Sequence, residues 1–269
     1  MRAKSYWEER LSTDFSLGGV GDRRLGVAYN KWLYRARRRA LGRALRLLRV
    51  DVAGKRALDL GCGTGFYVDY WLEKGASSVT GVDLTEVSIN NLKQRYPGLE
   101  FVCADIASEA VAALGKFEIV DAFDVLFHIV DEETFVRAWA NIAACLAEDG
   151  FAFVTDAMTR EDMPLSRQEC HRSYDRYRSV AESAGLEVVH LAPIFYTMLN
   201  SVDSRDASGP LRVLWWLTPR LLKASRRFRL NTVLGHLIGV SLYTLDGVVQ
   251  RLFRTGPTLK LMVLRPVRT

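Results

Sequence analysis

A buried-strand pattern that runs directly into three closely spaced glycines constrains the fold of this chain more than any other feature. Residues 57–65 read Ala-Leu-Asp-Leu-Gly-Cys-Gly-Thr-Gly, and a helix pattern begins at Phe66. Gly61, Gly63 and Gly65 lack the Cβ atom that would keep a ligand away from the backbone. The first turn of the following helix offers unpaired N–H groups and a partial positive charge. The stretch therefore predicts an α/β fold with a ligand-binding turn, the alternative being a tight connection with no ligand.

Two further strand patterns end in an acidic residue. Residues 78–84 end in Asp83-Leu84, and residues 99–106 end in Asp105-Ile106. In a doubly wound sheet an acid at the end of the second strand can accept hydrogen bonds from ribose hydroxyls. Two such carboxylates after a glycine-rich turn indicate a nucleoside ligand.

With these residues the sequence resembles the class I S-adenosylmethionine-dependent methyltransferases. Residues 59–65 match the acid-x-Gly-x-Gly-x-Gly motif of that family, and Phe66 departs from the Gly-x-Gly-x-x-Gly motif of dinucleotide enzymes. The resemblance implies S-adenosylmethionine as cofactor. It implies that Asp83 binds the ribose, Asp105 the adenine amino group and Ile106 the ring. The implied cofactor residues are Asp59, Gly61, Gly63, Gly65, Asp83, Leu84, Asp105, Ile106 and Phe123.

Strand and helix patterns alternate along the rest of the chain, with strands predicted at 117–123, 151–156 and 186–191. Such alternation predicts a parallel sheet. The resemblance implies a doubly wound, mostly parallel, seven-stranded Rossmann-like sheet whose last strand, residues 258–266, is antiparallel.

The sequence suggests three parts. Residues 1–53 are expected to form an N-terminal helical lid, with a glycine-rich loop at 16–21 and a long helix at 23–50 that has a candidate break at Gly42. Residues 54–194 and 258–269 would form the catalytic domain, and residues 195–257 a helical cap over the acceptor site. Core packing is the alternative for each candidate lid contact, namely Tyr6, Trp7, Tyr29, Asn30, Trp32 and Tyr34. Arg24 and Arg35 are candidates for the methionine carboxylate.

The cap segment raises the question of a membrane. Its apolar run 230–245 is shorter than the roughly 20 residues that span a bilayer, so we expect no transmembrane helix. Trp215 and Trp216 lie among basic residues, so peripheral contact with an anionic membrane is an alternative to packing on the catalytic domain.

The net charge of +6 is concentrated in two regions, of which residues 31–56 hold ten basic residues and one acid, Asp51. This basic helix face lacks interleaved aromatic residues, so a solvated face is preferred over nucleic-acid binding. The four cysteines have no metal-site or disulfide spacing, and residues 1–10 lack a signal-peptide pattern. We expect no metal and a bacterial cytoplasmic location.

Methyl transfer requires little acid–base chemistry, because the cofactor carries its own leaving group and the protein mainly aligns the reactants. A base helps when the acceptor is a hydroxyl. His128 follows the strand at 117–123 and is the candidate base, the alternative being a structural histidine. Secondary candidates near the acceptor are Asp156, Tyr196, Asn200 and Asp203.

The predicted function is methyl transfer from S-adenosylmethionine to a small-molecule acceptor, on an oxygen of a sugar, polyketide, quinone-like compound or other specialised metabolite. One alternative within the same chemistry is an RNA or lipid-linked acceptor. Another is a protein that keeps the fold and cofactor without transferring a methyl group, such as a binding module or a cyclase.

Overall fold

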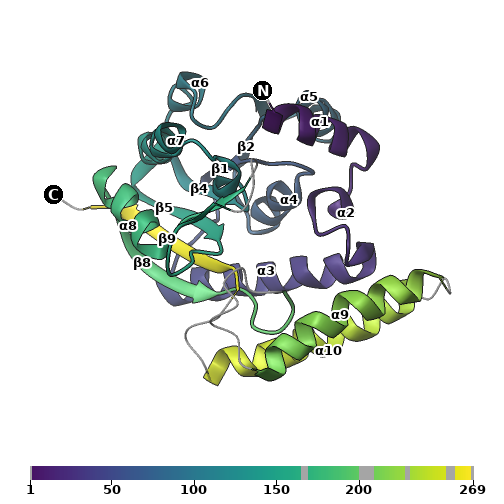
Figure 1. Cartoon of the computed structure of the whole chain (residues 1–269). Helices are drawn as coiled ribbons and strands as arrows, with labels where there is room; N and C mark the ends of the chain where they lie inside the picture. The colour runs from purple at the N-terminus through teal and green to yellow at the C-terminus, as the bar shows by residue number, and fades with distance from the viewer. Residues whose placement is uncertain (1, 165–168, 200–208, 228–230, 253–257, 268–269) are drawn as a thin grey trace.

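A seven-stranded sheet lies at the centre of the molecule (Figure 1), in a computed structural model that describes residues 2–164, 169–199, 209–227, 231–252 and 258–267. The strand order is β3-β2-β1-β4-β5-β9-β8, and β9 alone runs antiparallel to its neighbours β5 and β8. This confirms the predicted mostly parallel sheet with an antiparallel last strand. The strands are β1 (Arg56–Leu60), β2 (Ser78–Asp83), β3 (Glu100–Cys103), β4 (Phe117–Phe123), β5 (Leu146–Asp156), β8 (Leu186–Pro193) and β9 (Lys260–Pro266), with a separate small ladder of β6 (Met163–Pro164) and β7 (Cys170–His171).

Helices cover both faces of this sheet, as parallel strands require. On one face α3, α4 and α5 bury side chains such as Leu41, Trp71 and Leu92, and on the other α6, α7 and α8 bury Val111, Trp139 and Tyr177. The described helices are α1 (Arg2–Thr13), α2 (Leu17–Val20), α3 (Gly26–Leu48), α4 (Phe66–Glu73), α5 (Glu86–Arg95), α6 (Glu109–Ala112), the 3₁₀ turn η1 (Leu126–His128), α7 (Glu132–Cys145), α8 (Tyr174–Ser183), α9 (Gly209–Arg227) and α10 (Asn231–Leu252).

The N-terminal region differs from its prediction in two details. The expected loop at residues 16–21 contains the short helix α2, because the Ser16 side chain accepts a hydrogen bond from Gly18 N and caps it. The helix α3 continues through Gly42 without a break. One glycine costs about 1 kcal/mol in a helix, and burial of Leu41 and Leu45 beside it outweighs that cost.

The helix α10 lies along α3 at close range (Figure 1). A Cβ atom on Gly239 would come within 2.3 Å of Trp32 Cδ1, so glycine is required for this approach. Trp32 Nε1 donates to His236 Nδ1 at 3.1 Å, and an Arg39 guanidinium nitrogen donates to the Tyr243 carbonyl at 2.8 Å. The described part of the predicted cap therefore packs on the outer side of α3.

Two carboxyl groups meet inside the sheet. Asp59 on β1 and Asp121 on β4 are paired in the parallel register, and each is 1% exposed. Trp71 Nε1 donates to Asp121 Oδ2 at 2.5 Å. Burial raises the pKa of both carboxyls. The Asp59 carboxyl raises the pKa of Asp121 further, whereas a hydrogen bond from the Asp121 side chain opposes the rise at Asp59.

This pair predicts a pH-dependent stability. An acid whose native pKa is raised holds its proton more tightly when folded, so the free energy of unfolding falls as the pH rises above the unfolded pKa of about 4. Asp121→Asn keeps an acceptor for Trp71 and removes one ionisation. We expect this variant to be about 1–2 kcal/mol more stable than the parent at pH 8 and to show a flatter pH dependence. Urea unfolding between pH 5 and pH 8 measures this, and an unchanged slope contradicts it. Asp175→Asn, on the exposed start of α8, is the control.

Candidate functional site

A cavity of about 390 Å³ opens at the carboxyl ends of β1, β2 and β4, where α1 and α2 approach the sheet. Three parts of the chain form it. The turn after β1 and the ends of β2, β3 and β4 form the floor, the loop after β4 forms one wall, and the N-terminal helices close it. The lining residues are Ala3, Trp7, Leu11, Val20, Tyr34, Gly61, Cys62, Gly63, Thr64, Phe66, Tyr67, Asp83, Leu84, Ala104, Asp105, Ile106, Phe123, Asp124, Val125, His128, Ile129, Val130, Asp131 and Thr134.

The glycine-rich turn is held by the end of β2. The backbone N–H groups of Gly61 and Cys62 donate to the Val82 carbonyl at 2.7 and 2.9 Å. Gly61 has a φ of 88°, and a Cβ atom there would lie 2.2 Å from Val125 Cγ2. Both the left-handed backbone and the lack of space require glycine.

The acidic residues at the strand ends face the same cavity. Asp83 is 8% exposed and accepts hydrogen bonds from Gly63 N and Thr85 N, each at 2.9 Å. Burial raises the pKa of the Asp83 carboxyl, and these hydrogen bonds oppose that rise. Asp105, Asp124 and Asp131 also line the cavity, and its described lining holds no lysine or arginine. Such a cavity suits a ligand that carries positive charge and a nucleoside.

The helix α1 is fixed over the cavity by two anchors. The Glu8 carboxylate accepts from the backbone N–H groups of Glu86 and Val87, at 3.0 and 2.9 Å, and so caps α5. The Arg10 guanidinium donates to the Gly21 carbonyl at 2.5 Å and lies 4.8 Å from the Trp7 ring centre. The first contact holds α1 against the start of α5, and the second joins α1 to the end of α2.

Aromatic rings from α3, α4 and β4 form another part of the lining. Tyr34, Phe66, Tyr67 and Phe123 follow one another with ring centres 4.5, 5.0 and 4.1 Å apart. His128 lies 5.2 Å from the Trp7 ring in an edge-on arrangement and 4.1 Å from the adjoining Phe127 ring. The cavity lining therefore combines carboxylates with a row of aromatic rings, and His128 lies beside Trp7 of the lid.

Two arginines that the sequence analysis missed hold residues of the loop after β4. Arg37, on α3, pairs with the cavity residue Asp124 at 2.5 Å. Arg172 is 1% exposed and donates to the carbonyls of Ile129 and Val130, at 2.9 and 3.3 Å. No pattern distinguishes these two arginines from the many others in the chain, because their partners lie far away in the sequence.

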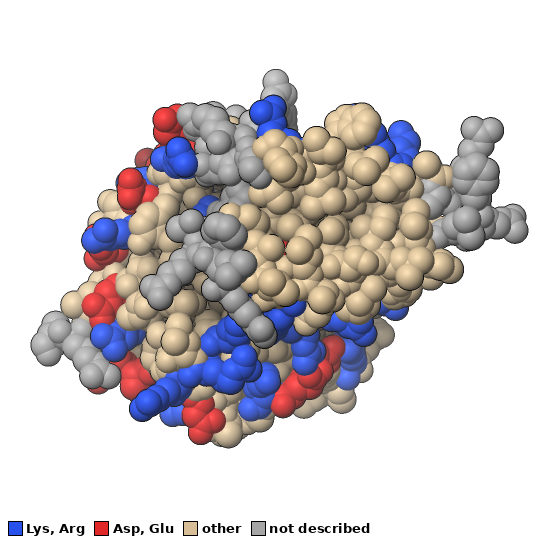
Figure 2. Space-filling view, turned by 90° about the horizontal axis from the view of Figure 1, so that it is seen from below, with Lys and Arg blue, Asp and Glu red and all other residues tan. Residues whose placement is uncertain are grey.

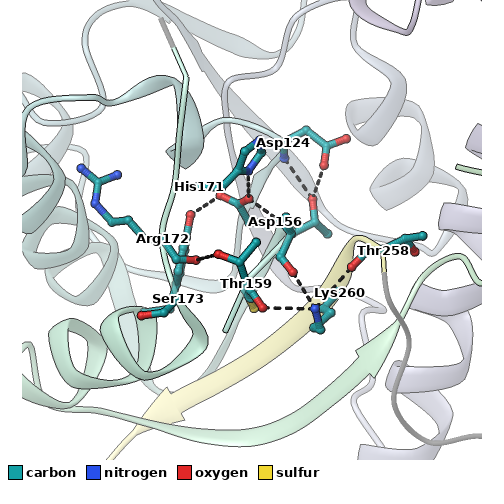
Figure 3. A network of polar contacts seen from close by, with 12 residues as sticks. Asp124, Asp156, Thr159, His171, Arg172, Ser173, Thr258 and Lys260 are labelled. Carbon is teal, nitrogen blue, oxygen red and sulfur yellow. Dashed lines mark hydrogen bonds and ion pairs between the residues drawn. The ribbon is translucent and has the colours of Figure 1, made fainter. Parts of the chain in front are cut away.

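A polar network supports the loops behind the cavity (Figure 3). Asp156, at the end of β5, is fully buried, and its Oδ1 lies 3.1 Å from His171 Nδ1. Its other oxygen accepts from the Tyr177 hydroxyl. Lys260 Nζ, from the antiparallel β9, donates to the Ala157 carbonyl at 2.6 Å. Asp156 therefore lies in this network and does not line the cavity.

The structure brings most of the predicted site residues together. Asp59 and Gly65 do not line the cavity, because Asp59 is buried against Asp121 and the Cβ position of Gly65 points toward Leu92 at 2.6 Å. Those that line it are Gly61, Gly63, Asp83, Leu84, Asp105, Ile106, Phe123 and His128. Their roles toward a cofactor or acceptor stay predictions.

Among the candidate lid residues, Trp7 and Tyr34 reach the cavity. Tyr29 instead donates to the Met198 carbonyl at 2.7 Å, and Trp32 packs on α10. The candidates for the methionine carboxylate lie elsewhere, since Arg24 pairs with Asp22 and the Arg35 guanidinium stacks on Trp32. Tyr6, Asn30 and Tyr196 do not line the cavity either.

The described residues of the segment 195–257 do not form the predicted cap over the acceptor site. No described residue of the segment 195–257 lines the cavity, because α10 packs on the outer side of α3. The predicted acceptor contacts Asn200 and Asp203 lie outside the described residues. The lid helices and the loop after β4 provide the cover instead.

The turn yields a direct test of ligand binding. We expect Gly61→Ala to weaken binding of S-adenosylhomocysteine at least tenfold, because the new methyl group clashes with Val125 and a left-handed φ is strained. Isothermal titration calorimetry measures the affinity. Gly98→Ala is the control, since a Cβ atom there meets nothing within 4 Å. Equal affinity for all three proteins contradicts the assignment of this turn.

Comparisons with known proteins agree with this geometry. Residues 57–150 match a family model described as a methyltransferase domain. A ubiquinone biosynthesis O-methyltransferase of Neisseria meningitidis serogroup C (strain 053442) is 31% identical over 108 residues, which are 38% of this chain and 44% of the relative. The match thus spans less than half the length of that curated relative.

Solved structures share the fold at low identity. Magnesium protoporphyrin IX methyltransferase from Synechocystis PCC 6803, crystallised with S-adenosylmethionine, has a TM-score of 0.52 at 17% identity, over 71% of this chain and 90% of its own. The cyclase SpnF has a TM-score of 0.54 at 16% identity, over 86% of this chain and 82% of its own. Residues 57–150 thus match a methyltransferase domain, and the chain shares the fold of a methyltransferase crystallised with S-adenosylmethionine.

Proposed function

We propose that this protein transfers the methyl group of S-adenosylmethionine to a hydroxyl oxygen of a small aromatic acceptor. The observation that carries the proposal is the cavity lining, which combines four carboxylates with a row of aromatic rings and His128. The carboxylates suit a cationic nucleoside, and the rings suit a flat apolar acceptor.

The residues present fit the cofactor. Gly61 and Gly63 line the cavity, and Asp83 and Asp105 would hold the ribose and the adenine amino group. When bound, S-adenosylmethionine supplies a methyl group on a positively charged sulfur. The acidic lining, which has no lysine or arginine in its described part, favours that charge.

The chain's own residues would position the acceptor and take its proton. Trp7 and Leu11 of the lid keep water out, and the Tyr67 and Phe123 rings orient a flat acceptor. His128 would accept the hydroxyl proton as the new oxygen–carbon bond forms. Arg37 holds Asp124, and Arg172 holds the 129–130 backbone, so the wall around His128 keeps its shape.

The class of acceptor follows from the lining and from the relatives. The relatives in the comparison act in ubiquinone biosynthesis by name, which supports an oxygen on an aromatic ring. The aromatic wall supports the same choice among the predicted acceptors, and it disfavours a sugar. SpnF shares the fold as a cyclase, so the fold alone does not decide between the two activities.

Turnover with defined acceptors tests the proposal. We expect the protein to convert S-adenosylmethionine to S-adenosylhomocysteine in step with methylation of a catechol such as 3,4-dihydroxybenzoate, and not of a simple hexose. Mass spectrometry of the product and the stoichiometry measure this. Asp83→Ala should raise the KM for S-adenosylmethionine at least tenfold, because a buried charged acceptor is lost. Asp175→Ala, an exposed acid on α8, is the control. Binding of the cofactor without any methylated product would favour the non-methylating alternative.

The base assignment has its own test. We expect His128→Gln to lower kcat about a hundredfold and to remove the fall in rate at acid pH, while binding of S-adenosylhomocysteine is unchanged. Steady-state rates between pH 5.5 and pH 9 measure this. His190→Gln, on the remote strand β8, controls for the loss of a histidine. Full turnover in the His128 variant would remove this residue from the mechanism.

A further inference from the structure

The outer face of the α9–α10 pair is an exposed apolar surface. Figure 2 shows it as a broad area without acidic or basic side chains. The exposed apolar residues recur at steps of three to five positions on α10, and of three or four on α9 apart from the adjacent pair Trp216 and Leu217, which places them on one side of each helix. We call this surface the hairpin face, made of Val213, Trp216, Leu217 and Leu221 on α9 with Val233, Leu237, Val240, Leu245 and Val248 on α10.

The length and exposure of α10 set it apart from the core helices. Residues 231–250 are long and apolar enough to cross a membrane by length and composition, yet only 22% of that window is buried. The apolar helix is thus longer than the run 230–245 seen in the sequence. One large side chain of the hairpin face, Leu237, is 57% exposed.

The opposite side of α10 packs against α3 and the segment that follows β8. Gly235 lies against Ala28, and Gln250 accepts from Arg43 at the far end of the same interface. Asp246 is fully buried and accepts from the backbone N–H groups of Tyr196 and Thr197, at 2.9 and 2.6 Å. Since α10 is docked along its length, its hairpin face can lie on a bilayer surface but the helix does not stand across one.

The charged residues of α9, beside the hairpin face, are all basic. The sequence holds no acidic residue from 207 to 245, and the next acid, Asp246, points inward. Arg212, Arg220 and Lys223 of α9 are exposed, and the Arg220 guanidinium lies 4.1 Å from the Trp216 ring centre. Basic side chains also follow one edge of the apolar area in Figure 2. A tryptophan with neighbouring arginines is typical of helices at a membrane interface.

We propose that the α9–α10 pair docks this protein in the plane of an anionic lipid bilayer. The hairpin face would enter the boundary between headgroups and acyl chains, and the basic residues beside it would meet the lipid phosphates. A second copy of the chain fits less well. A two-fold contact through this face would bring the same basic residues of both copies together, without an acid to pair them.

Vesicle flotation of the full chain tests the proposal. We expect binding to phosphatidylcholine vesicles with a third of phosphatidylglycerol, weaker binding as salt rises from 50 to 500 mM, and little binding to pure phosphatidylcholine. The double substitution Leu237→Ser and Leu245→Ser should lower the partition coefficient at least tenfold, because apolar surface is lost from the face. Arg212→Gln with Lys223→Gln should lower it about tenfold for anionic vesicles.

Matched variants separate the hairpin face from general hydrophobicity. Leu47→Ser with Val136→Ser removes two equally exposed apolar residues elsewhere and should leave binding unchanged. Light scattering of the lipid-free protein is the second measurement. Failure of the parent chain to bind anionic vesicles overturns the proposal, as does equal loss of binding in the two serine variants. A stable dimer that the Leu237 and Leu245 substitutions dissociate would assign the face to a second copy instead.

Discussion

The attachment of the glycine-rich turn to the end of β2 is the constraint on which the rest of the site depends. Two backbone N–H groups of the turn share the Val82 carbonyl, and a third, from Gly63, is held by the Asp83 carboxylate. One acid thus both faces the cavity and fixes the turn beside it. Parallel pairing of β1 with β2 and β4 makes this geometry available, because it brings three strand ends to one edge of the sheet.

Two parts of the protein enclose the cavity at that edge, a floor formed by the strand ends and a cover formed by the N-terminal helices. The floor is part of the sheet. There Asp59 on β1 and Asp121 on β4 pair in register, and burial raises the pKa of both carboxyls. The cover is made of α1 and α2, which Arg10 joins to each other at the Gly21 carbonyl and which Glu8 attaches to the start of α5. These contacts use backbone groups that helix and loop ends leave without partners. Capping of α5 therefore helps to fix the position of the lid.

The α9–α10 pair packs on the outer side of α3, away from the cavity. Gly239 of α10 admits the Trp32 ring of α3, and Asp246 accepts from the backbone N–H groups of residues 196 and 197. These contacts use one side of the helix pair and leave its apolar side outward. Surfaces of this kind on folded proteins mark a contact with a partner or a membrane. The proposed active site and the proposed membrane contact thus lie on different sides of α3.

The sequence by itself determined the parallel part of the sheet and the floor of the cavity, because these follow from local patterns, and the resemblance to class I methyltransferases supplied the antiparallel last strand. Glycines at 61 and 63 and acids at 83 and 105 stand directly at strand ends, and their position in the chain fixes their position in space. Only the tertiary structure decided which arginines contact the loop after β4 and where the helices α9 and α10 lie. Arg37, Arg172 and α10 have partners that are distant along the chain, and packing between distant segments leaves no periodic signal that local patterns could reveal.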